Sequence, residues 1–173
     1  RIYAIGAGGV LAGDVTIQRY LPVAGKVWRD LSVPVSGVTV STLQQYFPVT
    51  GNFSGASTGE GLPGTPSLFR SDGQATLTTY PSPGGTNTEP IEKGKGYAAF
   101  MYALTDSIGT TMEMTGQVFQ GEVTIPLASG TGAPTDGWTL AGNPYASAIK
   151  WADEGWSRSG VSPTVVVRQS KFN

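Results

Sequence analysis

The sequence predicts an all-β protein, a β-sandwich (immunoglobulin-like or jelly-roll-like) with an internal duplication and an incomplete second copy. Glycine and proline account for 25 and 12 of the 173 residues. They interrupt almost every window longer than about ten residues, and both weaken the interior of a helix. Short runs that alternate apolar and polar residues recur between clusters of turn-forming residues, a pattern typical of sandwiches and barrels.

The predicted strands follow one another along the whole chain. In the first, residues 14–21, the alternation places Val15, Ile17 and Arg19 on one face. Further runs with the composition of strands lie at residues 27–33, 37–40, 67–70, 75–80, 96–104, 111–114, 122–127, 138–141 and 164–169. Turn-forming residues separate many of these runs, at residues 51–66, 81–90 and 129–137.

Two local features complete the predicted elements. Val40, Leu43 and Phe47 recur near the helical spacing, so one short helix is expected within residues 39–47. Gly94 and Gly96 precede the apolar run at 96–104, where we expect a bulge or a tight turn.

Residues 13–17 (Gly-Asp-Val-Thr-Ile) resemble residues 121–125 (Gly-Glu-Val-Thr-Ile), and a tryptophan ahead of a proline follows each, at Trp28 and Trp138. The nearly constant offset of about 108 residues predicts a duplicated unit, and chance recurrence of a β-forming pentamer is the alternative. The two tryptophans are then expected to fill equivalent core positions. The predicted organisation is an N-terminal lead-in strand or linker (residues 1–12), a first sandwich repeat (residues 13–120), and a partial second repeat (residues 121–173) that packs on the first or is completed by another chain.

Composition excludes several classes of function. The chain has no histidine and no cysteine, so it lacks Ser–His and Cys–His nucleophile pairs, the common zinc sites, haem and iron–sulfur ligands, and disulfides. A net charge of −1 removes the electrostatic attraction that non-specific nucleic-acid binding needs. The longest apolar run, around residues 97–104, is too short to span a membrane. We therefore expect no nucleic-acid partner and no membrane insertion.

Sequence motifs with possible chemistry are weak, and we expect no enzymatic activity. Ser57 lies in a G-x-S-x-G pattern, but no histidine is present to act as its base. The G-x-G-x-x-G pattern at residues 59–64 has no helix pattern after it. A glycosidase would need two carboxyl groups across a cleft, and the close pairs are Glu89 with Glu92 and Asp153 with Glu154.

No cofactor is expected, with structural calcium the one possibility left open. Carboxylates in turn-like settings beside glycine or serine can supply oxygen ligands to calcium. The candidates are Asp72, Asp106, Asp136 and Asp153.

Four motifs occur in a fixed order: Gly-Asp-Val-Thr-Ile-Gln-Arg-Tyr-Leu-Pro (13–22), Trp28-Arg29-x-Leu31-Ser32-x-Pro34-Val35, Ile91-x-x-Gly94-Lys95-Gly96-Tyr97-x-x-Phe100, and Gly137-Trp138-x-Leu140-x-Gly142-Asn143-Pro144-Tyr145-x-Ser147-x-Ile149-x-Trp151. Together, over roughly residues 10–151, they resemble a β-sandwich module of large Bacteroidota cell-surface proteins that the type IX secretion system exports. The resemblance implies an extracellular or cell-surface location and a modular architecture, without a defined chemistry. Such modules usually continue to a further Gly-x-Gly-aromatic strand, so a fragment of a longer protein is expected.

The expected function is that of a non-enzymatic structural or adhesive module, with other protein modules or copies of itself as partners. One alternative is a carbohydrate-binding module that stacks surface glycans on exposed aromatic rings, with Trp151, Trp156 and Tyr80 as candidates. A second is a filament subunit that uses strand addition, with an edge strand at Thr164, Val165, Val166 and Val167. Ser107, in Asp-Ser-Ile, is a possible O-glycosylation site.

Overall fold

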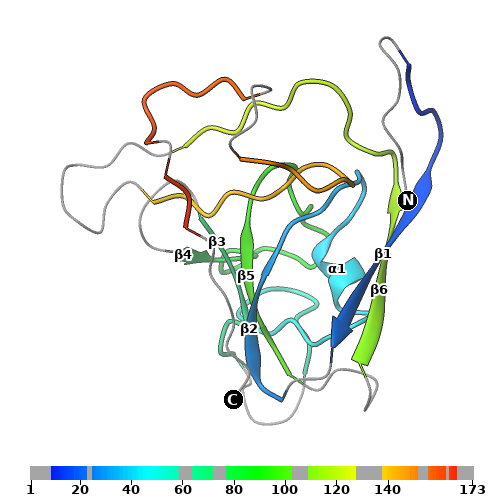
Figure 1. Ribbon diagram of the computed structural model, residues 1–173. Coiled ribbons are helices and arrows are strands. Elements are labelled where there is room, and N and C mark those ends of the chain that lie inside the picture. The colour runs from blue at the N-terminus through cyan, green and yellow to red at the C-terminus, as the bar shows by residue number, and fades with distance from the viewer. Residues whose placement is uncertain are drawn as a thin grey trace.

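The structure is a computed structural model that describes residues 9–22, 25–58, 64–71, 77–102, 109–127, 138–151, 156–162 and 164–166. Within these ranges the elements are β1 (Val15–Pro22), β2 (Val27–Leu31), α1 (Val40–Leu43), β3 (Leu68–Ser71), β4 (Leu77–Thr79), β5 (Tyr97–Met101) and β6 (Gly109–Gly116) (Figure 1). The strands form two antiparallel sheets, β1-β6 and β2-β5-β3-β4. The predicted all-β class is confirmed.

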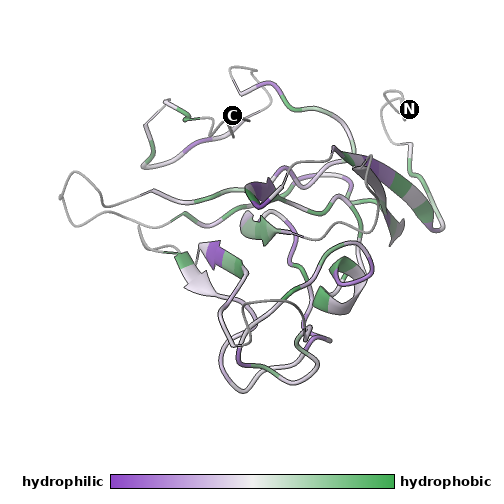
Figure 2. Cartoon of the chain, turned by 90° about the horizontal axis from the view of Figure 1, so that it is seen from below, coloured by the Kyte–Doolittle hydropathy of each residue, from purple (hydrophilic) through white to green (hydrophobic). Residues whose placement is uncertain are grey.

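β1 and β6 pair along their full lengths, from Val15 opposite Gly116 to Pro22 opposite Gly109. From Thr110 onward, buried and exposed residues alternate along β6, because successive side chains of a strand point to opposite faces. Figure 2 shows this alternation as hydrophobic and hydrophilic bands on the paired strands at the right. Met112 and Met114 face the core, and burying each stabilises the fold by about 2 kcal/mol.

One hydrophobic core joins both sheets to α1. Thr39 caps the helix: its side chain accepts a hydrogen bond from the Thr42 amide, and the Thr42 side chain accepts one from the Thr39 amide. The helix buries Val40 and Leu43. Phe47 follows one turn later and is also buried, so the predicted helix within residues 39–47 is present in shortened form and packs as its spacing indicates.

Several predicted strands are absent. Residues 37–40 lead into the capped helix, because the Thr39 cap turns the chain before a strand can form. The described residues at 122–127, 138–141 and 164–166 form no regular strand, and residue 141 makes only an isolated bridge with Lys95. Residues 15–17 form the start of β1 whereas residues 121–125 are irregular, so the duplication is not confirmed, and neither is the sandwich.

The prediction that Trp28 and Trp138 fill core positions is wrong, since their exposed fractions are 42% and 52%. Trp28 lies on the outer face of its sheet because β2 turns Leu31, three residues later, toward the core. Smaller aliphatic side chains, with Phe47 and Tyr97, occupy the space between the sheets.

Among the described residues, no helix has both the length and the apolar character needed to cross a bilayer. Residues 1–8 of the predicted lead-in lie outside the described ranges.

Candidate functional site

One edge of β1 has no strand beside it in the described part of the chain. On β6, the carbonyl of Glu113 accepts a hydrogen bond from the Tyr46 hydroxyl at 3.2 Å. Just beyond β6, the carbonyl of Gln117 accepts one from the Ser36 amide at 2.9 Å. Backbone groups in an antiparallel ladder alternate between the two edges of each strand, so Gln18, opposite Glu113, directs its N–H and C=O away from β6. The unpaired edge of β1 therefore offers backbone donors and acceptors.

β2 likewise pairs on one edge, with β5. The amide of Phe100 in β5 donates to the Ser67 carbonyl at 2.7 Å, on the side of β3. By the same alternation Trp28, which lies opposite Phe100, directs its backbone groups away from β5, and so does Asp30 two residues later. The second edge of β2 thus also carries hydrogen-bonding groups.

Residues of both strands line one groove of about 400 Å³. Residues 17–19 of β1 and residues 30–32 in and after β2 form its two sides. Its lining comprises Ile17, Gln18, Arg19, Asp30, Leu31, Ser32, Pro34, Gly96, Met114, Leu140, Ala141, Gly142, Asn143, Tyr145 and Ala146.

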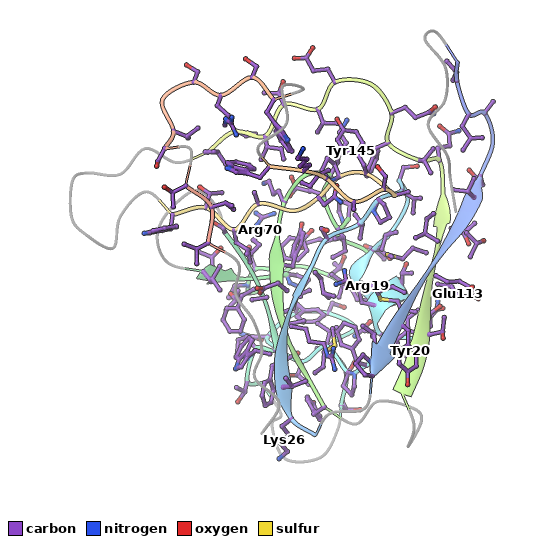
Figure 3. All side chains as sticks on the ribbon, in the orientation of Figure 1. Arg19, Tyr20, Lys26, Arg70, Glu113 and Tyr145 are labelled. Carbon is purple, nitrogen blue, oxygen red and sulfur yellow. The ribbon has the colours of Figure 1, made fainter. Side chains whose placement is uncertain are left out.

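Arg19 is the exposed cation of this groove. It shares a face of β1 with Ile17 and Leu21, and in Figure 3 it lies between the ribbons of β1 and β2. Its side chain makes no hydrogen bond, ion pair or ring contact with any described residue. Arg29 on β2 donates to the Pro22 carbonyl at 2.8 Å, and burial together with the Arg19 charge lowers the pKa of Arg29. Arg19 is thus the one cation among the described residues that line the groove, and Asp30 is the one carboxylate.

The 138–146 segment closes one end of the groove, and Figure 3 shows Tyr145 above Arg19 there. Two backbone hydrogen bonds hold the segment at the start of β5: the Gly96 amide donates to Leu140, and the Gly142 amide donates to Gly94, both at 2.9 Å. A Cβ on Gly96 would lie 2.6 Å from the Leu140 carbonyl oxygen, so only glycine allows this approach. Gly94 has a φ of +76° in the turn before β5, as predicted.

The aromatic residues expected to bind sugar do not form one exposed platform. Tyr80 is buried, with an exposed fraction of 4%. Trp151 and Trp156 lie 5.3 Å apart between ring centroids, but their planes are tilted by 48°. The Arg158 guanidinium lies 5.3 Å from the Trp151 ring centroid, and Trp156 donates its indole N–H to the Lys150 carbonyl. The two tryptophans are thus half-buried and engaged with their own segment.

An aromatic cluster that the sequence reasoning missed lies on the outer face of the larger sheet. Trp28 packs on Phe69 and Phe100, with ring centroids 5.6 and 5.2 Å apart. The three rings come from three neighbouring strands, and Ala98 between them is fully buried. Strand register alone would have placed these residues on one face, because each occupies an outward position.

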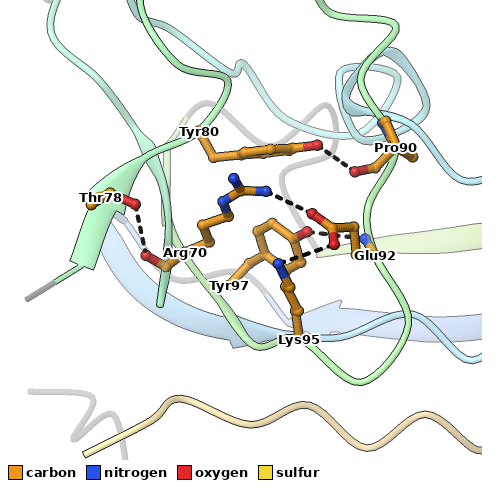
Figure 4. A network of polar contacts seen from close by, with 7 residues as sticks. All are labelled: Arg70, Thr78, Tyr80, Pro90, Glu92, Lys95 and Tyr97. Carbon is orange, nitrogen blue, oxygen red and sulfur yellow. Dashed lines mark hydrogen bonds and ion pairs between the residues drawn. The ribbon is translucent and has the colours of Figure 1, made fainter. Parts of the chain in front are cut away.

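A polar network ties the 90–97 loop to β3 (Figure 4). Arg70 forms an ion pair with Glu92 at 2.6 Å, and Lys95 forms a second at 3.0 Å. The Arg70 guanidinium also lies 4.6 Å from the centroid of the Tyr80 ring. Tyr80 donates its hydroxyl to the Pro90 carbonyl, and the Tyr97 hydroxyl accepts from the Glu92 amide at 3.0 Å. The network holds the loop in place.

Glu89 and Glu92, one of the two carboxylate pairs considered for glycosidase chemistry, each bind different partners. Glu92 neutralises two cations. The Glu89 carboxylate instead accepts a hydrogen bond from the Thr86 amide within its own turn. Both carboxylates thus have structural partners, two cations for Glu92 and a turn amide for Glu89.

Replacing Tyr80 by phenylalanine is expected to lower the free energy of unfolding by about 1.5 kcal/mol, because the Pro90 carbonyl loses a buried donor. Tyr46→Phe is the matched control, since its hydroxyl bonds at an exposed position and water can replace it. Urea titrations of both variants measure the difference. Equal costs for the two variants would contradict the structural role of Tyr80.

The same burial predicts an alkaline limit to stability. Desolvation raises the pKa of Tyr80 and of Tyr97 above the ordinary value of 10.0. Above about pH 10 the unfolded chain loses these protons while the folded chain keeps them, so stability is complete below that pH and falls as pH rises. Tyr80→Phe is expected to make the loss of unfolding free energy with rising pH less steep. An unchanged pH dependence would contradict the role given to Tyr80.

The remaining sequence candidates are placed as follows. Ser57 has a structural role, since its hydroxyl accepts from the Val49 amide at 3.1 Å and bonds the Gln44 side chain at 3.0 Å. Thr164, Val165 and Val166 are exposed, while Val167 and Ser107 lie outside the described residues. So do the four aspartates considered for calcium and the Asp153–Glu154 pair. In the ranges that are described, no three acidic side chains gather as metal ligands.

Comparisons of the chain with protein-family models, with curated proteins and with solved structures find no match.

Proposed function

We propose that this chain is a non-enzymatic structural or adhesive module of a secreted or cell-surface bacterial protein, and that it binds an extended segment of a neighbouring module by strand addition. The observation that carries the proposal is the groove beside the second edge of β1, where Gln18 directs its backbone N–H and C=O away from β6. An extended chain in this groove gains affinity from main-chain hydrogen bonds and specificity from alternate side chains.

The other two functions considered have less support. Carbohydrate binding is disfavoured because Tyr80 is buried and the Trp151–Trp156 pair is tilted. A filament of identical subunits is supported by the exposure of Val165 and Val166, at 50% and 64%, which leaves that segment available to a second copy. The proposed export rests on the resemblance of the four motifs to Bacteroidota surface modules.

The experiment uses a labelled peptide of alternating threonine and valine and follows amide hydrogen exchange in the protein. The Gln18 amide is expected to exchange rapidly in the free protein and slowly with bound peptide, because it gains a partner in the groove. Gln18→Pro removes this N–H and is expected to weaken binding about tenfold, while the β1–β6 ladder is retained.

Gln18→Ala is the matched control, because it removes the same side-chain bond to Glu113 but keeps the backbone donor. It is expected to bind the peptide as the unmodified chain does. Strand addition is refuted if Gln18→Pro, shown to be folded by circular dichroism, binds as tightly as Gln18→Ala. Protection confined to amides away from β1 and β2 would refute it as well.

A further inference from the structure

We infer that the segment bound in the groove is an acidic strand of another protein, with an aspartate or glutamate beside Arg19 and an apolar residue two positions away beside Ile17. This inference rests on the proposed function and names the chemistry of its partner. It follows from the position of Arg19 on β1 and from the residues that surround it.

Arg19 interrupts an apolar row. Val15, Ile17 and Leu21 on the same face are buried or half-buried, whereas Arg19 is exposed where that row borders the groove. Its cross-strand partner on β6 is Met112, which is apolar and buried and cannot neutralise it. A side chain on an added strand would lie about 5 Å from Arg19 on its other side, within reach of an ion pair.

The charges around Arg19 favour an anion. Arg19 is the one cation among the described lining residues, and the neighbouring Arg29, which donates to the Pro22 carbonyl, brings no negative charge to it. Asp30 is the one carboxylate of the lining, and it has an interaction of its own. A carboxylate in a partly desolvated groove forms stronger, charge-assisted hydrogen bonds with guanidinium than it does in open water.

The position of the added strand that lies beside Ile17 favours an apolar side chain. Ile17, Leu31 and Met114 line the groove next to the core, and Met114 is directly opposite Ile17 in the ladder. Side chains two residues apart on an added strand point to the same face. An acid beside Arg19 therefore goes with an apolar residue beside Ile17, whichever direction the added strand runs.

The test uses a symmetrical probe, the peptide Thr-Val-Thr-Asp-Thr-Val-Thr, which presents the same pattern in both directions. Peptides with asparagine or lysine in place of the aspartate are the comparisons, and binding is measured by fluorescence anisotropy at low salt. The unmodified chain is expected to bind the aspartate peptide about fivefold more tightly than the asparagine peptide, and the lysine peptide most weakly. Raising the salt should reduce this preference.

Arg19→Glu is expected to reverse the order, so that the lysine peptide binds most tightly, and Arg19→Gln is expected to abolish the preference. Unchanged order in Arg19→Glu would overturn the inference. Equal binding of all three peptides that Gln18→Pro still weakens would refute the acidic partner while strand addition stands. Binding that Gln18→Pro does not affect would refute strand addition itself.

Two other occupants are separate outcomes of the same experiment. Free aspartate that competes as strongly as the peptide would show that the groove binds a small anion, and it would overturn the assignment to a strand. Self-association of the chain that Gln18→Pro abolishes, measured by sedimentation, would identify a second copy as the occupant and overturn the assignment to another protein.

Discussion

Replacing Phe47 by alanine is expected to reduce the free energy of unfolding by about 4 kcal/mol, because it leaves a large cavity in the core. The side chain is 2% exposed and belongs to the cluster that joins α1 to both sheets. A loss of this size is a large fraction of the roughly 5–15 kcal/mol that stabilises a typical domain. Equilibrium denaturation in urea measures it.

Phe100→Ala provides the matched control, because it removes the same ring from a half-buried position on the outer face of the sheet. It is expected to cost about 2 kcal/mol, since solvent already reaches part of this ring. If the two variants were equally stable, Phe47 would not be at the centre of the core.

Replacing Gly116 by alanine is expected to cost about 3 kcal/mol through steric overlap. A Cβ at this position would overlap the Ser36 carbonyl oxygen and lie 3.0 Å from the Ser36 carbonyl carbon. Both atoms are backbone, and the Ser36 amide is already bonded to Gln117, so the overlap cannot be relieved by a side-chain rotation. Thermal and urea unfolding measure the cost.

Gly25→Ala is the control for Gly116→Ala, because a Cβ on Gly25 would meet no atom within 4 Å. It is expected to change stability by less than about 0.5 kcal/mol. Comparable losses in both variants would mean that the close approach of Ser36 to β6 does not constrain position 116.

The local sequence pattern correctly predicted β1 and α1. Alternation identified β1 and its face, and the helical spacing of Val40 and Leu43 identified α1. The runs at residues 122–127 and 138–141 have the same apparent β character but remain irregular, since a strand also needs a partner at the right distance. The burial of Tyr80 could not be predicted either. It depends on the Tyr97 ring, whose centroid lies 5.3 Å away although the two residues are distant in the sequence.

The groove was beyond local pattern for the same reason. It forms because β1 and β2, neighbours in the chain, join different sheets, which depends on pairings with β6 and β5 far along the sequence. Sequence reasoning instead placed the edge available to a partner at residues 164–167. The one local signal for the groove was Arg19 in an apolar row, since a cation at such a position needs a reason.

Arg19 also affects how two copies of this chain interact when no partner strand is bound. An exposed strand edge is a template for uncontrolled aggregation, and natural proteins often protect such edges with a charged residue. Two copies approaching through β1 would bring like charges together at the same border, and repulsion would separate them. The residue that selects an acidic strand therefore also protects the protein from sticking to itself.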